Sequence, residues 1–253
     1  MELVGFLSPK WIPGKKGKKK LVIEGGEGSG EPEGHPFRGN QYTVGGSTGA
    51  ENAESESPQI TNWDDRAKVR EATKWTIGLA ESKNILESEL ELVKEYVSDG
   101  HAMVNNSLRG THPEDFKDNK WTQIIADKLI PVMDSVMKKS FTTKDTVLYR
   151  GVGGMELKVG QTFIDKGFVS CSSQKIVGDH FRNIQREGSS PSYSVKIYVP
   201  KGTPAISVPE IGKIDEDEEN EVCLNRGIKF VVESVYEKTA VLRVLSRGNG
   251  HND

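Results

Sequence analysis

An acidic run lies directly before an apolar stretch near the end of the chain. It spans residues 215–221, and six of its seven residues carry a carboxylate, with only Asn220 interrupting. Because side chains alternate across a β-strand, we expect Glu219 and Glu221 to share one face, with Cys223 on the same face. Two carboxylates on one wall of a cleft can take different roles when their environments differ, one stabilising a cation and the other accepting a proton.

Two further segments place polar side chains at the ends of expected strands. Arg150 stands in "LYRG", and Ser170, Cys171 and Ser172 stand in "GFVSCSS". Taken singly, an arginine at a strand end is typical of a surface, a serine-rich strand end is typical of a turn, and an acidic patch is typically solvated. The order in which the three segments follow one another is therefore what carries information.

In that order and spacing, the three segments resemble the arginine, serine–threonine–serine and glutamate–x–glutamate motifs of the ADP-ribosyltransferase exoenzyme family. This family contains the clostridial binary actin-modifying toxins and the Rho-modifying exoenzymes. The resemblance runs from about Glu71 to about Val244, and the helical part matches it through Tyr96, His101 and "NNSLRG" at residues 105–110.

The resemblance implies that NAD is the substrate, that nicotinamide is released and that the anomeric carbon is inverted. Glu221 would stabilise the oxocarbenium-like ribose through its 2′-hydroxyl, and Ser170 would support that glutamate. Ser172 matches the last serine of its motif, whereas Cys171 replaces the threonine. Since Cys171 should alternate away from Ser170, we expect a buried thiol and not a nucleophile.

The resemblance also assigns side chains that bind NAD. Arg150 would bind a phosphate and the ribose side through its planar guanidinium, and Gly151 would leave room for backbone bonds to the nicotinamide amide. Either Arg182 or Arg186, which precede "EGSSPS", would bind phosphate, and the sequence does not choose between them.

The helical part contributes three further candidates for the NAD site, Tyr96, His101 and Asn105. Tyr96 and His101 would line the adenosine side, although aromatic side chains on helices are as often part of a core. The two interpretations stay open at this point.

Glu219 points to the chemical class of the acceptor. A guanidinium, with a pKa above about 12, stays protonated and attacks only where a carboxylate orients it and takes a proton. Carboxylate–guanidinium pairing favours arginine over lysine, and the Rho-modifying branch carries Gln where this chain has Glu219. We therefore expect the acceptor to be an accessible arginine of a target protein.

The acids at residues 215–218 allow more than one interpretation. They would attract a basic acceptor, or they form a solvated loop. A calcium loop needs an alternating oxygen-ligand and glycine spacing that this run lacks, and the expected reaction needs no metal.

Composition sets broad limits on the chain. Its 253 residues are 34% hydrophobic and 28% charged, which suits one globular domain. The net charge of −3 gives no global attraction to nucleic acid or anionic lipid. We read no signal peptide and no membrane-spanning run, which predicts a soluble protein without a membrane partner.

The first part of the chain is expected to be a disordered tail over residues 1–57, because it is rich in Gly, Ser, Glu and Lys and poor in apolar residues. The cluster from Lys15 to Lys20 is where a weak contact with nucleic acid would occur. The island "GHPFRGNQYT", at residues 34–43, resembles a segment of phage-encoded proteins.

The remaining residues, 58–247, predict a single α+β domain. About four helices come first, capped by Asp64 or Asn62 at the start and with a kink or a break at Pro131. Strand-like runs follow Phe141, with one helix near residues 175–185, and imply a mixed or antiparallel two-sheet core on which the helices pack.

The sequence allows two functions other than transfer to arginine. The fold could be a catalytically weak NAD-binding or virion-associated module that serves assembly or partner binding, or it could modify nucleic acid. Localisation, virion association and delivery into a host cell are not decided by the sequence.

Overall fold

The computed structural model describes residues 55–111, 120–188, 191–212 and 219–248. Most of the predicted tail, with the Lys15–Lys20 cluster and residues 34–43, lies outside the described residues. So do residues 215–218 of the acidic run.

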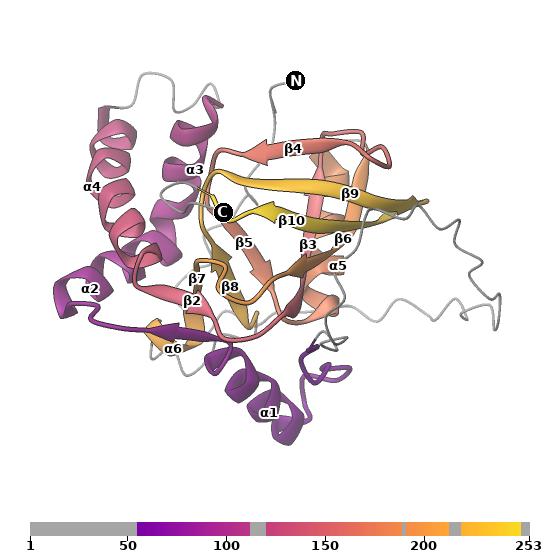
Figure 1. The fold of residues 1–253 in the computed structure, drawn as a ribbon, viewed down its shortest axis with the longest axis horizontal. Helices are drawn as coiled ribbons and strands as arrows, with labels where there is room; N and C mark the ends of the chain where they lie inside the picture. The colour runs from indigo at the N-terminus through magenta and orange to yellow at the C-terminus, as the bar shows by residue number, and fades with distance from the viewer. Residues whose placement is uncertain (1–54, 112–119, 189–190, 213–218, 249–253) are drawn as a thin grey trace, which may run out of the picture.

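The fold is α+β, as the sequence predicts, with most helices before most strands (Figure 1). In the part of the chain that the structure describes, four α-helices precede Phe141, and the short helix α6 lies among the later strands in addition to the predicted helix α5. The elements are α1 (Arg66–Ile77), β1 (Ala80–Ser82), α2 (Glu87–Glu95), the π-helical turn η1 (Tyr96–Gly100), α3 (His101–Arg109), α4 (Lys120–Met137), β2 (Ser140–Thr142), β3 (Thr146–Gly153), β4 (Thr162–Asp165), β5 (Val169–Ser172), α5 (Lys175–Gly188), β6 (Ser192–Val199), β7 (Ala205–Ser207), α6 (Val208–Gly212), β8 (Glu221–Leu224), β9 (Ile228–Tyr236) and β10 (Thr239–Ser246).

The main sheet has eight strands in the order β4-β9-β10-β6-β3-β5-β8-β7, and β1 pairs with β2 in a separate sheet. Strands β10 and β6 are parallel, and the other pairs are antiparallel. Strands β3 and β5 are registered at one position, Tyr149 opposite Ser172. This single position joins the two parts of the sheet, β4-β9-β10-β6-β3 and β5-β8-β7. Side chains from both parts, such as Leu148 and Leu224, share one hydrophobic core.

The helices form a second core against the end of the sheet. Tyr96, Leu129 and Met133 are buried there with Phe168 and Cys223. Helix α4 continues across Pro131, where the sequence predicts a kink or a break, so the helix does not break there. Proline removes one backbone hydrogen bond, but buried side chains on both sides of it hold the helix in place. The N-cap of α1 is Asp65, not Asp64 or Asn62, and its side chain accepts from the amide of Lys68 at 3.2 Å.

The segment from Ser55 to Ile60, here called the N-terminal strap, lies across the region where β5 leads into α5. The fully buried side chain of Gln174 donates to the Ser57 hydroxyl at 2.8 Å and accepts from the amide of Ile60 at 2.8 Å. Glu56 pairs with Lys196 on β6 at 2.6 Å. The strap thus contacts β6 and the segment that follows β5.

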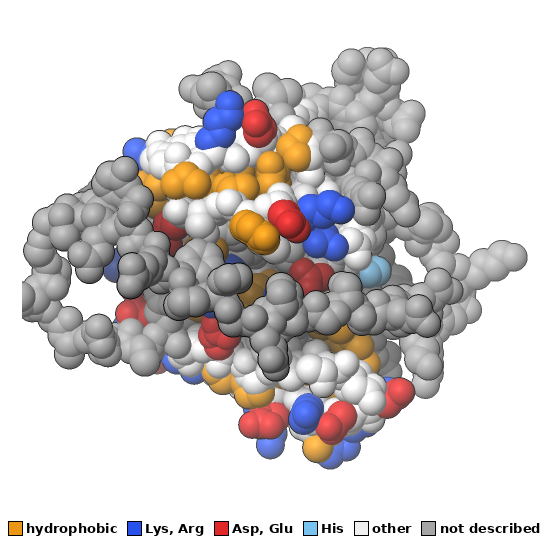
Figure 2. All heavy atoms as spheres, turned by 90° about the vertical axis from the view of Figure 1, so that its right-hand side faces the viewer, with side chains coloured by type: hydrophobic (Ala, Val, Ile, Leu, Met, Phe, Trp, Pro, Cys, Tyr) orange, Lys and Arg blue, Asp and Glu red, His pale blue; other side chains and the backbone are white. Residues whose placement is uncertain are grey.

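The surface carries charges of both signs. On the face shown in Figure 2, acidic and basic side chains of the described residues lie side by side, between exposed apolar side chains. Within the described ranges, no helix is long and apolar enough to cross a membrane.

Candidate active site

A cleft opens between η1 and α3 on one side and β3, β5, α5 and the turn before β8 on the other. It is lined by most of the residues that the sequence singles out. These are His101, Asn105, Arg150, Gly151, Ser170, Ser172, Glu219 and Glu221. Segments that are far apart in the sequence therefore meet where the sequence predicts a site.

The two carboxylates reach the cleft in a way that strand alternation does not explain. Strand β8 begins at Glu221, whereas Glu219 lies in the preceding turn. Between them Asn220 has a left-handed backbone, with φ of 46°. Both residues line the cleft, but the premise of a continuous strand from Glu219 to Glu221 is wrong.

Arg150 and Ser170 connect the two parts of the sheet at the cleft. Arg150 lies on β3, and one of its terminal nitrogens donates to the backbone carbonyl of Ser170 on β5. Ser170 is registered with Cys223, and Ser172 with Glu221. Because directly paired residues of antiparallel strands share a face, Ser170, Ser172 and Glu221 belong to the same surface.

Ser172 has a specific place in this arrangement. Its hydroxyl donates to the backbone carbonyl of Glu219 at 2.5 Å and accepts from the amide of Gln174 at 2.9 Å. The amide of Ser173 donates to the carbonyl of Asn220 at 3.1 Å. The end of β5 therefore holds the turn that carries Glu219, and the Ser172 hydroxyl makes these two bonds within the protein.

Gly151 is required by packing. A Cβ atom there would overlap the backbone of Phe181 and Arg182 on α5. Helix α5 can therefore approach β3 only because this residue has no side chain, whatever part Gly151 takes in binding NAD.

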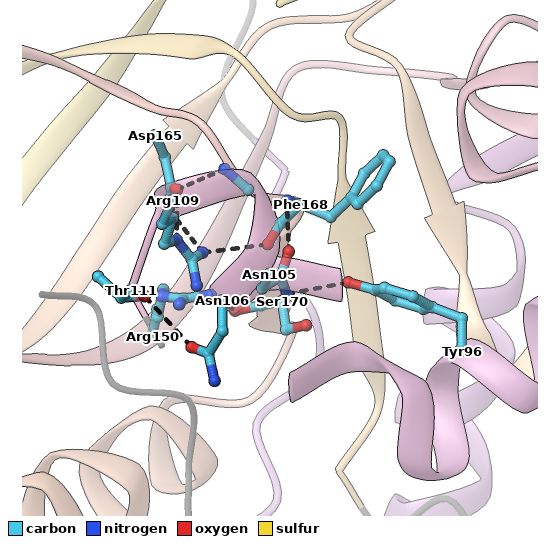
Figure 3. A network of polar contacts seen from close by, with 10 residues as sticks. Tyr96, Asn105, Asn106, Arg109, Thr111, Arg150, Asp165, Phe168 and Ser170 are labelled. Atoms are coloured by element: carbon cyan, nitrogen blue, oxygen red, sulfur yellow. Dashed lines mark hydrogen bonds and ion pairs between the residues drawn. The ribbon is translucent and has the colours of Figure 1, made fainter. Parts of the chain in front are cut away.

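Asn105 lies in a buried polar network that Figure 3 shows beside Arg150 and Ser170. Its amide donates to the hydroxyl of Tyr96 at 3.1 Å and accepts from the backbone amide of Phe168 at 2.8 Å. Arg109, one turn further on, donates to both carboxylate oxygens of Asp165 at 2.8 and 3.1 Å. These bonds fix the segment before β5 and hence Ser170.

The open choice for Tyr96 and His101 is resolved differently for each residue. Tyr96 is 1% exposed and packs edge-on against Phe168 at 5.7 Å between ring centroids, so it belongs to the core and does not line the cleft. Burial raises the pKa of its hydroxyl well above the ordinary value. His101 lines the cleft.

The two phosphate candidates are not both placed. The side chain of Arg182 donates to Asn183 at 2.7 Å and is not among the residues that line the cleft in the described ranges. Arg186 lies on α5, and its side chain is outside the described part of the chain. The assignment of either to a phosphate stays a prediction.

Cys171 is buried, as expected from strand alternation. It is 4% exposed and packs in the main core, although it also borders the cleft. Burial raises the pKa of its thiol to about 12 and raises that of Cys223 well above its ordinary value. Such thiols are protonated at neutral pH and are poor nucleophiles.

Several residues of the cleft were not predicted as site residues. Val97 and Arg109 extend the line through His101 and Asn105, each residue four positions from the next. Val177 and Phe181 are likewise four apart on α5. Residues four apart share a helix face, so this spacing is the signal that could have found them.

The described residues contain no cluster of three or more histidine, cysteine, aspartate or glutamate side chains arranged to hold a metal ion. The cleft is lined by two carboxylates, the guanidinium of Arg150, the imidazole of His101 and serine hydroxyls, while the guanidinium of Arg109 is paired with Asp165. This set suits the stabilisation of a cation next to a bound anion.

A family model described as ADP-ribosyltransferase exoenzyme matches residues 72–249. No curated protein matches the chain.

Solved structures share the fold at low sequence identity. The ADP-ribosyltransferase Vis from Vibrio splendidus, in complex with agmatine, has a TM-score of 0.55 and 18% identity over 74% of this chain and 86% of that one. The C3 exoenzyme of Clostridium limosum has a TM-score of 0.53 and 17% identity over 77% of this chain and 99% of that one. The toxin BECa of C. perfringens, solved with NADH, has a TM-score of 0.53 and 16% identity over 75% of this chain and 50% of that one.

Proposed function

Since this chain belongs to the ADP-ribosyltransferase exoenzyme family, we propose that it cleaves NAD and transfers the ADP-ribose to an arginine side chain of a target protein. The observation that carries this proposal is that Glu219 and Glu221 line one cleft together with Arg150 and Ser170.

The reaction needs two catalytic roles, stabilisation of the ribose cation and activation of the acceptor, and the cleft holds a group for each. As the bond between the ribose C1′ and nicotinamide breaks, nicotinamide leaves with the electron pair and the ribose becomes cation-like. Glu221, held in β8 opposite Ser172, stabilises that cation electrostatically. Arg150 holds the anionic part of NAD through its planar guanidinium.

Glu219 activates the acceptor. A nitrogen of the incoming guanidinium forms the new bond to C1′, and the proton that it loses passes to the carboxylate. A glutamine at position 219 would neither take a proton nor pair with a cation. The second carboxylate therefore supports an arginine acceptor. The complex of Vis with agmatine adds support, because agmatine carries the same guanidinium group.

The test measures two activities of the full chain, consumption of NAD in water and transfer of labelled ADP-ribose to agmatine. We expect Glu221→Gln to abolish both, by about 100-fold or more, since it removes a transition-state charge. We expect Glu219→Gln to abolish transfer and to leave hydrolysis. Glu233→Gln, an exposed acid of β9 that pairs with Arg243, is the matched control and should keep both activities.

The target is sought by labelling proteins of bacterial and eukaryotic lysates and locating the modified residue by mass spectrometry. Modification of arginine in bands that vanish with Glu219→Gln supports the proposal, and modification of another residue type contradicts the acceptor class. If the wild-type chain binds NAD but neither consumes it nor transfers ADP-ribose, the NAD-binding module replaces the enzyme. The phage origin and the weak nucleic-acid contact of Lys15–Lys20 stay predictions.

A further inference from the structure

The backbone of Asn220 separates the two carboxylates of the cleft. It adopts φ of 46°, in the left-handed region that glycine and asparagine tolerate better than other residues. In an extended strand, Glu219 would continue the line of β8. The left-handed residue instead interrupts the extended conformation immediately before β8, and Glu219, on the far side of it, lines the cleft.

The two carboxylates are held to different degrees. Glu221 is part of β8 and is registered with Ser172. Glu219 lies outside the strand, where its backbone carbonyl accepts from the Ser172 hydroxyl at 2.5 Å. The orientation of Glu219 therefore depends on the conformation of Asn220, whereas Glu221 keeps its strand partner.

The Asn220 side chain is itself unusual. The residue is fully buried, and neither its amide nitrogen nor its amide oxygen has a hydrogen-bond partner among the described residues. A buried amide without partners disfavours folding, so its side-chain hydrogen bonding gives no reason for asparagine here. The backbone conformation gives one, since asparagine enters the left-handed region more easily than other residues that have a Cβ.

We propose that Asn220 is a positioning residue that determines how the cleft partitions between transfer to an acceptor and hydrolysis of NAD. Its left-handed backbone directs the Glu219 carboxylate to the acceptor without moving Glu221. This inference rests on the function proposed above, in which Glu219 activates the acceptor and Glu221 stabilises the ribose cation.

The test compares Asn220→Gly, Asn220→Ala and Asn220→Val in the full chain, with NAD and agmatine as the reactants. Glycine adopts the left-handed conformation freely, so both activities should stay within about twofold of wild type. Valine resists it strongly, so transfer should fall by about tenfold or more while hydrolysis stays within about twofold. The valine variant should thus behave like Glu219→Gln.

A matched control places the same change at another left-handed residue. Asn84, with φ of 58°, is exposed beyond the end of β1 and does not line the cleft. Asn84→Val should leave the ratio of transfer to hydrolysis unchanged, which separates positioning from a general loss of stability.

An unchanged ratio in Asn220→Val overturns the proposal, as does a parallel fall of both activities or an equal loss of transfer in Asn220→Gly. If Asn220→Val does not fold, Asn220→Ala is judged by the same ratio. If wild type lacks both activities, the proposed function fails. If wild type has both and the ratio does not respond to residue 220, only the positioning role fails.

Discussion

Arg109 and Asp165 form a buried, two-pronged ion pair that fixes the entrance to β5. Their side chains are 3% and 2% exposed, and Arg109 also donates to the carbonyl of Phe168 at 3.4 Å. Asp165 further accepts from the amide of Gly167 at 3.0 Å. The pair thus determines the path of the chain just before Ser170.

Removing one partner of this pair should be costly, because it leaves the other charge buried and uncompensated. We expect Arg109→Leu or Asp165→Leu to lower the free energy of unfolding by about 3–5 kcal/mol, and the double variant to lose less than the sum. Urea unfolding measures all three. Lys83→Ala, which breaks the exposed pair with Glu81, should cost less than about 1 kcal/mol. Full additivity in the double variant would contradict direct pairing.

The strand half of the site could be predicted from the sequence with more success than the helical half. Arg150, Ser170 and the two glutamates lie in short motifs whose order is visible in the chain, and all four line the cleft. Asp165 could not be found, since its partner Arg109 is 56 positions away and nothing in local spacing marks a long-range buried pair.

Tyr96 shows why helical candidates are harder to assign. An aromatic residue on an amphipathic helix has the same local pattern whether it faces a core or a cleft. Its burial against Phe168 depends on how the helices pack on the end of β5, which is tertiary information. The conformation of Asn220 could not be predicted from local pattern either, because alternation predicts a strand where the structure has a turn.

The N-terminal strap should contribute to stability through Gln174. Its buried amide also donates to the carbonyl of Pro58 at 3.1 Å, so removal of the strap leaves it without these partners. We expect a chain that starts at Thr61 to be less stable than one that starts at Ser55 by about 2 kcal/mol or more. Thermal and urea unfolding compare the two. Equal stabilities would show that water replaces the strap without loss.

The thiol of Cys171 should be inert in the folded chain. Burial raises its pKa to about 12, so almost no thiolate is present at pH 8. We expect iodoacetamide to label neither Cys171 nor Cys223 in native protein and to label both in urea, as followed by mass spectrometry. Rapid labelling of native Cys171 would mean a reactive thiol at the border of the cleft and would reopen the possibility of a nucleophile.

Glu89 should make stability depend on acid pH through its contacts with Lys139, Leu86 and Ser135. Its carboxylate accepts from Lys139 at 2.7 Å, from the Leu86 amide at 2.8 Å and from Ser135 at 2.7 Å. The hydrogen bond from Lys139 is the largest cause that lowers its pKa from 4.5 to about 2. Since the pKa is lower in the folded state, the stabilisation is complete above pH 4.5 and is lost as the pH falls towards 2.

We therefore expect Glu89→Gln to lower the free energy of unfolding by about 2 kcal/mol at pH 7, because hydrogen bonds to a charged group are lost. The difference from wild type should shrink steadily between pH 4.5 and pH 2.5 in urea unfolding. Glu91→Gln is the matched control on the same helix, since Glu91 is exposed and pairs with Lys94, and it should cost less than about 0.5 kcal/mol at any pH. A Glu89→Gln deficit that stays constant down to pH 2.5 would mean that shape, and not the carboxylate charge, accounts for the contribution of Glu89.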